Sequence, residues 1–197
     1  MKKTLLAAAF ILFAGATGAV EMGKPAPDFS VQDISGHAQS LGAYKGKVIV
    51  LEWNNPGCPF VHKHYDTGNM QKLQAYAKGK GVVWLTVNSG AAGMEGNETS
   101  AEAAAQVKAV GGHETAYILD PHGTLGHLYG AKATPHMFVI GKDQALVYAG
   151  AIDNKPTTDH ADVKDADNYV RDAIDATLAG KAVAVSSTRA YGCSVKY

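Results

Sequence analysis

Apolar runs typical of strands alternate with stretches of helical character along the first two thirds of the chain. Three runs predict buried strands: Val48–Trp53, Val82–Val87 and Ala116–Leu119. A helix of about 20 residues is expected after residue 58, with a kink or break at Thr67-Gly68-Asn69. A second helix, capped by Thr99 or Ser100, should run to Val110. Strands and helices in this order favour parallel strand pairing.

The last third of the chain changes to a hairpin pattern. Met137–Ile140 and Ala145–Ala149 flank a Gly-Lys-Asp-Gln turn, which predicts two antiparallel strands. A short helix over Thr124–Tyr129 should precede the hairpin, and a helix over Asp165–Leu178 should follow it. Near the N-terminus, Phe29–Gln32 alternates as an edge strand would. Together these elements predict an α/β sandwich, with parallel strands early and an antiparallel pair late.

The first nineteen residues have the features of a secretory signal peptide. Lys2 and Lys3 form a basic start, residues 5–14 are apolar, and Thr17-Gly18-Ala19 offers small residues for cleavage. The apolar run is shorter than the roughly 20 residues of a membrane span, and an uncleaved anchor is the alternative. We therefore expect a periplasmic protein without membrane attachment after cleavage.

Size and charge narrow the functional classes. Removing Lys2 and Lys3 from the 18 basic residues leaves the chain slightly acidic, because it has 18 acidic residues. With only two arginines, Arg171 and Arg189, the chain has no basic patch for nucleic acid or an anionic membrane. We expect three segments: a signal peptide over 1–19, one domain over 20–180 and a tail over 181–197.

A strand-to-helix turn holds the strongest candidate for chemistry. The apolar run to Trp53 is followed by Asn-Asn-Pro-Gly, then by Cys58 and Pro59. Proline is favoured at the start of a helix because its missing N–H would have no partner there. Cys58 should therefore be the N-cap, with the amides of Phe60 and Val61 directed at its sulfur. Such donors and the helix dipole favour the thiolate, so we expect a nucleophile.

The other cysteine is Cys193, in the tail. A structural disulfide between Cys58 and Cys193 would be ordinary in an oxidising compartment. A domain of this size does not need such a staple, and the position of Cys58 favours reactivity, so we prefer a redox role. A mobile tail would suit a resolving cysteine, whereas a permanent clasp is the alternative. The sequence leaves both open.

Several stretches together resemble one known superfamily. They are Ala26-Pro27-Asp28-Phe29, Tyr44–Val50, Trp53–Cys58, Tyr117–Asp120 and Ala133–Ile140. The chain resembles the peroxiredoxin-like proteins of the alkyl hydroperoxide reductase/thiol-specific antioxidant (redoxin) superfamily. The resemblance implies a thioredoxin-like three-layer sandwich, in which a mixed central sheet has helices on both faces. It also implies that Thr134-Pro135 carries a cis peptide bond and faces Cys58.

The chain departs from the familiar members of that superfamily. Thioredoxin-type motifs have a second cysteine where this chain has Val61, so dithiol exchange within the motif is excluded. Peroxiredoxins require a Thr or Ser three residues before the reactive cysteine, and here that position relative to Cys58 is Asn55. They also require an arginine, and none occurs before Arg171. The pattern resembles a subgroup that keeps only the first cysteine and often ends in a tail like Gly192-Cys193-Ser194.

Histidines near Cys58 have two interpretations each. His62 lies one helical turn after Cys58 and could tune the thiol, take its proton or bind a metal with it; the alternative is an ordinary surface histidine. We expect His64 to be a surface residue. For His136, next to Pro135, an ordinary structural role is favoured over a functional one. His113, His122, His127 and His160 are expected at the surface.

Residues around the turn are supporting candidates. Trp53 is expected in the core, although it flanks the turn, and Pro59 starts the helix. Asn55 could hydrogen-bond within the turn or to a substrate. Glu52 interrupts an apolar strand and is either a buried proton carrier or a residue that reaches solvent.

The sequence supports two hypotheses of different classes. The first is an exported thiol–disulfide oxidoreductase or thiol-based antioxidant, with Cys58 as nucleophile and Cys193 as resolving cysteine. Its partners would be a protein or small-molecule disulfide or oxidant and an external thiol reductant, and no cofactor is expected. The second is a copper- or zinc-binding module using Cys58, His62 and His136. A redox-inactive binding domain with a structural disulfide is a lesser alternative.

Overall fold

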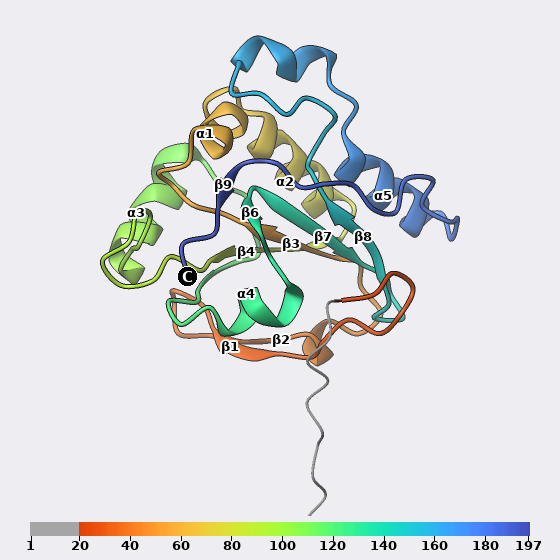
Figure 1. Cartoon of the computed structure of the whole chain (residues 1–197). Helices are drawn as coiled ribbons and strands as arrows, with labels where there is room; N and C mark the ends of the chain where they lie inside the picture. Colours follow the sequence, from red (N-terminus) through yellow and green to blue (C-terminus); the bar gives the residue numbers. More distant parts are fainter. Residues whose placement is uncertain (1–19) are drawn as a thin grey trace, which may run out of the picture.

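The computed structural model describes residues 20–197, so the expected signal peptide lies outside the described residues. Five strands form the central sheet, in the order β5 (Ala116–Leu119), β4 (Val83–Asn88), β3 (Ile49–Trp53), β7 (His136–Ile140) and β8 (Leu146–Gly150). The first three strands are parallel, and β7 and β8 add antiparallel pairs (Figure 1). The predicted change from parallel to antiparallel pairing is confirmed.

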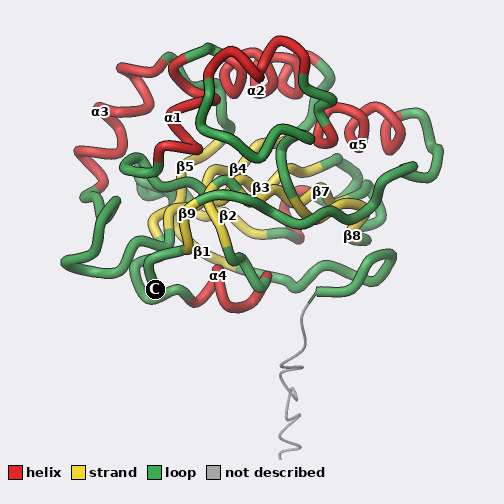
Figure 2. Tube along the Cα trace, turned by 45° about the horizontal axis from the view of Figure 1, so that its top comes forward, coloured by secondary structure: helices red, strands yellow, loops and turns green. Residues whose placement is uncertain are grey.

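Helices and a small hairpin cover the two faces of this sheet. One face packs against α2 (Asn69–Gly79) and α5 (Tyr169–Leu178). The other packs against α4 (Thr124–Tyr129) and the hairpin of β1 (Ser30–Gln32) and β2 (Ala38–Ser40). Figure 2 shows the sheet between these two layers. The thioredoxin-like three-layer sandwich is therefore confirmed.

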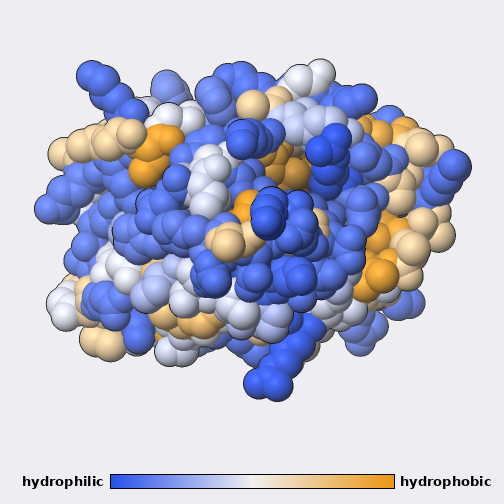
Figure 3. All heavy atoms as spheres, turned by 90° about the horizontal axis from the view of Figure 1, so that it is seen from above, coloured by the Kyte–Doolittle hydropathy of each residue, from blue (hydrophilic) through white to orange (hydrophobic). Residues whose placement is uncertain are grey.

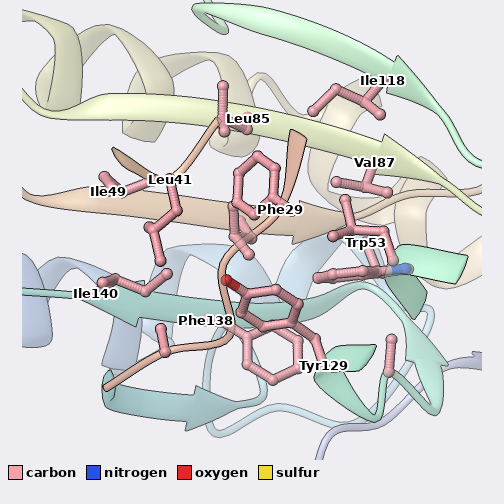
Figure 4. Close-up of a cluster of buried hydrophobic side chains, with 14 of the residues drawn as sticks. Phe29, Leu41, Ile49, Trp53, Leu85, Val87, Ile118, Tyr129, Phe138 and Ile140 are labelled. Atoms are coloured by element: carbon pink, nitrogen blue, oxygen red, sulfur yellow. The ribbon is translucent and has the colours of Figure 1, made fainter. Parts of the chain in front are cut away.

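The core on the α4 face lies directly under the turn that carries Cys58. The Trp53 ring contacts Tyr129 and Phe138, with ring centroids 5.8 and 5.2 Å away (Figure 4). The Trp53 indole N–H donates to Ser89 Oγ at 3.0 Å. Trp53 thus belongs to the core, as expected, and anchors the end of β3 below the turn.

The helix after Cys58 is broken where the sequence predicts. Helix α1 spans Pro59–Asp66, and α2 begins at Asn69. Gly68 lies between them with a φ of 69°, a left-handed conformation that glycine adopts without strain. Helix α3 (Ser100–Val110) begins with a reciprocal capping box between Thr99 and Glu102, as predicted from Thr99.

The predicted start of the last helix is wrong. The segment before α5 is a separate 3-10 helix, η2 (His160–Asp165), capped by the Asp159 side chain. Helix α5 begins only at Tyr169, because the Asn168 side chain accepts a hydrogen bond from the Arg171 amide. The side-chain cap at Asn168 therefore starts the helix at Tyr169, later than the predicted start at Asp165. A further 3-10 helix, η1, spans Gly42–Tyr44.

The tail after residue 180, for which the sequence left a mobile segment and a clasp both open, is hydrogen-bonded to the body of the domain. The Ala149 amide donates to the Ser186 carbonyl, and the Ala91 amide donates to the Lys196 carbonyl. Between these points, β9 (Cys193–Ser194) pairs antiparallel with β6 (Ala133–Thr134). Figure 1 shows the tail crossing from α5 to β6.

The surface carries no sign of an extended apolar face on the side drawn in Figure 3. That view looks down on η2 and α1 and shows mostly hydrophilic side chains with small, separate apolar spots. Within residues 20–197, no helix is both long enough and apolar enough to cross a bilayer.

Candidate active site

The turn after β3 is built by its own side chains and by the neighbouring loop. The Asn55 side chain accepts from the Gly57 amide at 2.8 Å and donates to the Glu95 carbonyl at 3.2 Å. The Cys58 amide donates to the Asn55 carbonyl at 3.0 Å. Asn55 therefore acts within the turn, one of the two roles considered for it. These bonds fix the direction in which the chain enters α1.

Cys58 is the N-cap of α1 and Pro59 its first residue, as the turn pattern predicts. The expectation for the sulfur, however, is wrong. Among residues 20–197, no backbone amide donates to the Cys58 sulfur; the amides of Val61 and His62 instead donate to the Cys58 carbonyl. Cys58 Sγ itself donates to the Thr134 carbonyl at 3.1 Å. The nearest hydrogen-bond partner of this sulfur is therefore an acceptor, and not the backbone donors expected from the N-cap position.

The same Thr134 brings the second cysteine to the site. In the β6–β9 pair, Thr134 lies opposite Cys193, so the residue that accepts from Cys58 is the register partner of Cys193. The Thr134-Pro135 peptide bond is cis, in agreement with the resemblance. Both cysteines are free thiols; Cys58 is buried and Cys193 half-buried. Two thiols far apart in the sequence therefore lie next to the same residue, Thr134.

Burial and the neighbouring thiol set the acidity of Cys193. Burial is the largest cause that raises the Cys193 pKa, to about 12, and the adjacent Cys58 side chain adds to it. The Glu95 carboxylate raises this pKa further, whereas Lys196 opposes the shift. Cys193 is therefore a protonated thiol at neutral pH.

Glu95 is a site residue that the sequence reasoning missed. Its carboxylate reaches back over the turn, where a Cβ placed on Gly57 would lie 2.8 Å from Glu95 Oε1. Its backbone carbonyl accepts from Asn55. The loop after β4 has no local pattern that could have placed this carboxylate beside Cys58 and Cys193.

The nearby histidines separate into exposed and buried groups. His62 is on the exposed side of α1, with its ring nitrogen 3.6 Å from the Asp66 carboxylate. His136 is buried, and its Nδ1 accepts from the Lys132 amide at 3.2 Å. Burial, followed by the charge of Lys132, lowers the His136 pKa to about 4, so its ring is neutral near pH 7.

No group of three or more His, Cys, Asp or Glu side chains suited to a metal occurs in residues 20–197, so the metal-binding hypothesis gains no support.

His64 is fully buried, so the expectation of a surface histidine is wrong. Its Nε2 lies 3.2 Å from the Tyr191 hydroxyl, and its Nδ1 lies 2.8 Å from Asn69 Nδ2. Burial lowers its pKa to about 4. The tail residue Tyr191 covers this side of α1, which the helix sequence could not reveal. His113, His122, His127 and His160 are exposed, as expected.

Glu52 does not reach solvent; it is completely buried under α1 and α2. Its carboxyl group accepts from the Tyr65 hydroxyl at 2.8 Å and from the Trp84 indole N–H at 2.7 Å. Side chains of Asn54, Gln74 and Thr86 also donate to it. Burial raises the Glu52 pKa, although these donors oppose the shift. The solvent-exposed alternative is therefore excluded, and the proton-carrier role stays a prediction.

Comparisons with known proteins agree with this architecture. The model of the Redoxin family matches residues 21–170. A solved structure of a hypothetical protein from Sinorhizobium meliloti is 26% identical, with a TM-score of 0.76, over 91% of this chain and 96% of that chain. An uncharacterised conserved protein from Geobacillus kaustophilus is 24% identical, with a TM-score of 0.76, over 90% and 92% of the two chains.

A third structural neighbour carries a functional name. It is a Chlorobium tepidum protein provisionally named thiol:disulfide interchange protein DsbE, 23% identical with a TM-score of 0.60. The match covers 81% of this chain and 99% of that chain, and at this sequence identity it supports a shared fold alone. A search of curated proteins found no match.

Proposed function

The chain belongs to the Redoxin family, and we propose that it is an exported thiol–disulfide oxidoreductase with Cys58 as nucleophile and Cys193 as resolving cysteine. One observation carries the proposal: Cys58 Sγ bonds the carbonyl of Thr134, and Thr134 is the register partner of Cys193. Two adjacent free thiols, one at a helix N-terminus and the other on a neighbouring strand, suit reversible disulfide chemistry. Export rests on the sequence features of residues 1–19.

The proposed reaction has two exchange steps. The Cys58 thiol first gives up its proton and attacks a disulfide R–S–S–R, forming Cys58–S–S–R and releasing RS⁻. The Cys193 thiolate then attacks the Cys58 sulfur of that mixed disulfide, forming the Cys58–Cys193 disulfide and releasing a second RS⁻. An external thiol reductant would reduce this disulfide and reset the protein. With a peroxide as oxidant, the intermediate would be a sulfenic acid on Cys58, and Cys193 would displace water from it.

Trapping the intermediate tests the proposal. A Cys193→Ser variant treated with dithiobis(nitrobenzoate), an aromatic disulfide that releases a coloured thiolate, should release one equivalent and keep the other half on Cys58. The wild type should release two equivalents and end with the internal disulfide, as read by intact mass. In the matched control Cys58→Ser, no internal disulfide can form. The proposal fails if the wild type retains the aromatic group, or if Cys193→Ser leaves Cys58 unmodified.

A further inference from the structure

Strand β9, which carries Cys193, has only a short backbone pairing with β6. Strands β6 and β9 pair at two positions, Ala133–Ser194 and Thr134–Cys193. Pairing this short is marginal in water without further contacts. Something else must therefore keep Cys193 opposite Thr134.

On the C-terminal side of this strand, Val195 packs against the core. On the N-terminal side, the side-chain contacts to the body of the domain come from Tyr191, two residues before Cys193. Its hydroxyl donates to Asp153 Oδ1 at 2.5 Å and lies 3.2 Å from His64 Nε2. Its ring lies 5.9 Å from the Phe60 ring, and Lys63 Nζ is 5.5 Å from its centroid.

Three of these contacts belong to helix α1, which starts directly after Cys58. Phe60, Lys63 and His64 lie within its first two turns. Tyr191 therefore links the strand that carries Cys193 to the helix that Cys58 caps, and it adds Asp153, from the segment after β8, as a third support. A side chain so placed fixes the position of one thiol relative to the other.

The tyrosine hydroxyl satisfies a buried charge. Asp153 is 2% exposed, and its Oδ1 accepts only the Tyr191 hydroxyl and the Lys155 amide among the described residues. Its Oδ2 has no hydrogen-bond partner within residues 20–197 and lies 4.0 Å from His64 Nε2. Removing the hydroxyl would leave a buried carboxylate short of a donor, so the bond is a strong local constraint.

Cys58 is itself completely buried where the tail lies against it. Because β9 lies beside Cys58, we expect a disulfide reagent to reach the sulfur when the strand carrying Cys193 moves away. The same strand must return for Cys193 to attack the mixed disulfide. How firmly the strand is held thus has opposite effects on the two steps.

From these contacts we propose that Tyr191 is a positioning residue, which holds the Cys193 strand over Cys58 through its bond to Asp153 and its contacts with α1. It slows the first attack on an external disulfide and speeds closure of the Cys58–Cys193 bond. This inference rests on the proposed two-cysteine function.

The test uses Tyr191→Phe in the full-length protein, with dithiobis(nitrobenzoate) under single-turnover conditions. The first release of coloured thiolate should become faster by about tenfold, the factor expected for one buried hydrogen bond to a charged group. The second release should become slower, by up to the same factor. Opposite changes in two phases would not follow from a general loss of stability, which would speed or slow both together.

A matched control is available in the same chain. Tyr76 also donates its hydroxyl to a carboxylate, that of Asp175, but this bond joins α2 to α5, away from the tail. Tyr76→Phe should leave both phases at wild-type rates. If Tyr191→Phe does not fold, Asp153→Asn, which replaces the carboxyl acceptor of Tyr191 with a weaker amide oxygen, should change the two phases in the same opposite directions by a smaller factor.

The outcomes separate this inference from the function on which it rests. A wild type that never releases the second equivalent contradicts the two-cysteine function. A wild type that releases both, together with a folded Tyr191→Phe that has unchanged phases or phases shifted in parallel, contradicts only the role of Tyr191.

Discussion

At the scale of single residues, the two thiols at the site have different surroundings. Cys58 donates its proton to the Thr134 carbonyl. Burial and the adjacent Cys58 raise the pKa of the Cys193 thiol to about 12. Attack by Cys58 on a disulfide requires that its thiol loses a proton. Attack by Cys193 requires a lower Cys193 pKa, and conversion of Cys58 to a mixed disulfide removes one of the causes that raise it.

The raised pKa of Cys193 predicts how this thiol alkylates. Because only the thiolate reacts, the rate at Cys193 should keep rising with pH well above the roughly 8.5 of a free cysteine. In Cys58→Ala, the contribution of Cys58 to the raised Cys193 pKa is removed while burial remains. The pH at which the Cys193 alkylation rate levels off should therefore fall partway toward the free-cysteine value. Iodoacetamide labelling with peptide mass analysis gives both profiles. A plateau near the free-cysteine value in the wild type would contradict the assignment.

Residue positions were predictable from the sequence where the cause is local. The N-cap place of Cys58 follows from the strand, the turn and Pro59, all adjacent in the chain. The partner of its sulfur was not predictable, because Thr134 comes from a distant strand. His64 was wrongly expected at the surface for the same reason, since Tyr191 of the tail lies over it.

At the scale of elements, Gly192 decides how closely β9 approaches β6. Its φ is 138°, and a Cβ placed on it would lie 2.0 Å from the Thr134 carbonyl oxygen. No side chain fits there while the strands remain paired. This contact is backbone against backbone, so it cannot relax through a rotamer change.

Gly192→Ala should therefore detach the strand that carries Cys193 while leaving the central sheet intact. We expect the Cys58–Cys193 disulfide to form at least about tenfold more slowly after oxidation, because the clash costs more than the short pairing gains. Non-reducing mass analysis after an oxidant pulse measures this rate. Gly180→Ala, at another left-handed glycine with open space around it, is the control. Equal rates in the wild type and Gly192→Ala would show that the close approach is not needed.

Most helices and strands could be predicted because their signals are local. The break between α1 and α2 and the cap of α3 follow from Gly68 and Thr99. The start of α5 was placed too early, at Asp165, because the apolar spacing does not mark the first turn and the Asn168 cap does. Strand β9 was missed because Cys193 and Ser194 are extended only through their pairing with β6.

At the scale of the whole molecule, the free energy of unfolding depends on pH through buried histidines and a buried glutamate, whose effects have opposite signs. Burial lowers the pKa values of His64 and His136 to about 4. A lowered histidine pKa contributes stability above the unfolded value of about 6.5, and this contribution is lost as pH falls toward 4. Burial raises the pKa of Glu114 to about 7, so Glu114 contributes stability at low pH that is lost as pH rises through 7.

Glu114→Gln should therefore make the protein more sensitive to acid. Between pH 7 and 5 the wild type gains stability from Glu114 that offsets part of the loss from the two histidines. Without it, the free energy of unfolding should fall by about 1–2 kcal/mol more over the same interval. Urea unfolding at both pH values measures the difference between the two proteins. If the free energy of unfolding falls by the same amount in the wild type and in Glu114→Gln between pH 7 and 5, the raised pKa of Glu114 is contradicted.

The fold class was predictable from the alternation of strands and helices, and the family resemblance supplied the layers. The path of the tail was not predictable, because its anchors, such as Ala149 and Ala91, are separated along the chain and meet only in the folded domain. The sequence could therefore propose a pair of cysteines, whereas their meeting at Thr134 needed the three-dimensional structure.

The Thr134 carbonyl offers a built-in spectroscopic reporter. While Cys58 keeps its hydrogen, the sulfur donates to this oxygen. Once the sulfur is bonded to another sulfur, that donor no longer exists, and the stretching frequency of the carbonyl should rise. An isotope label at this single peptide group would then let infrared absorption follow the oxidation state in real time, without a dye or a reagent.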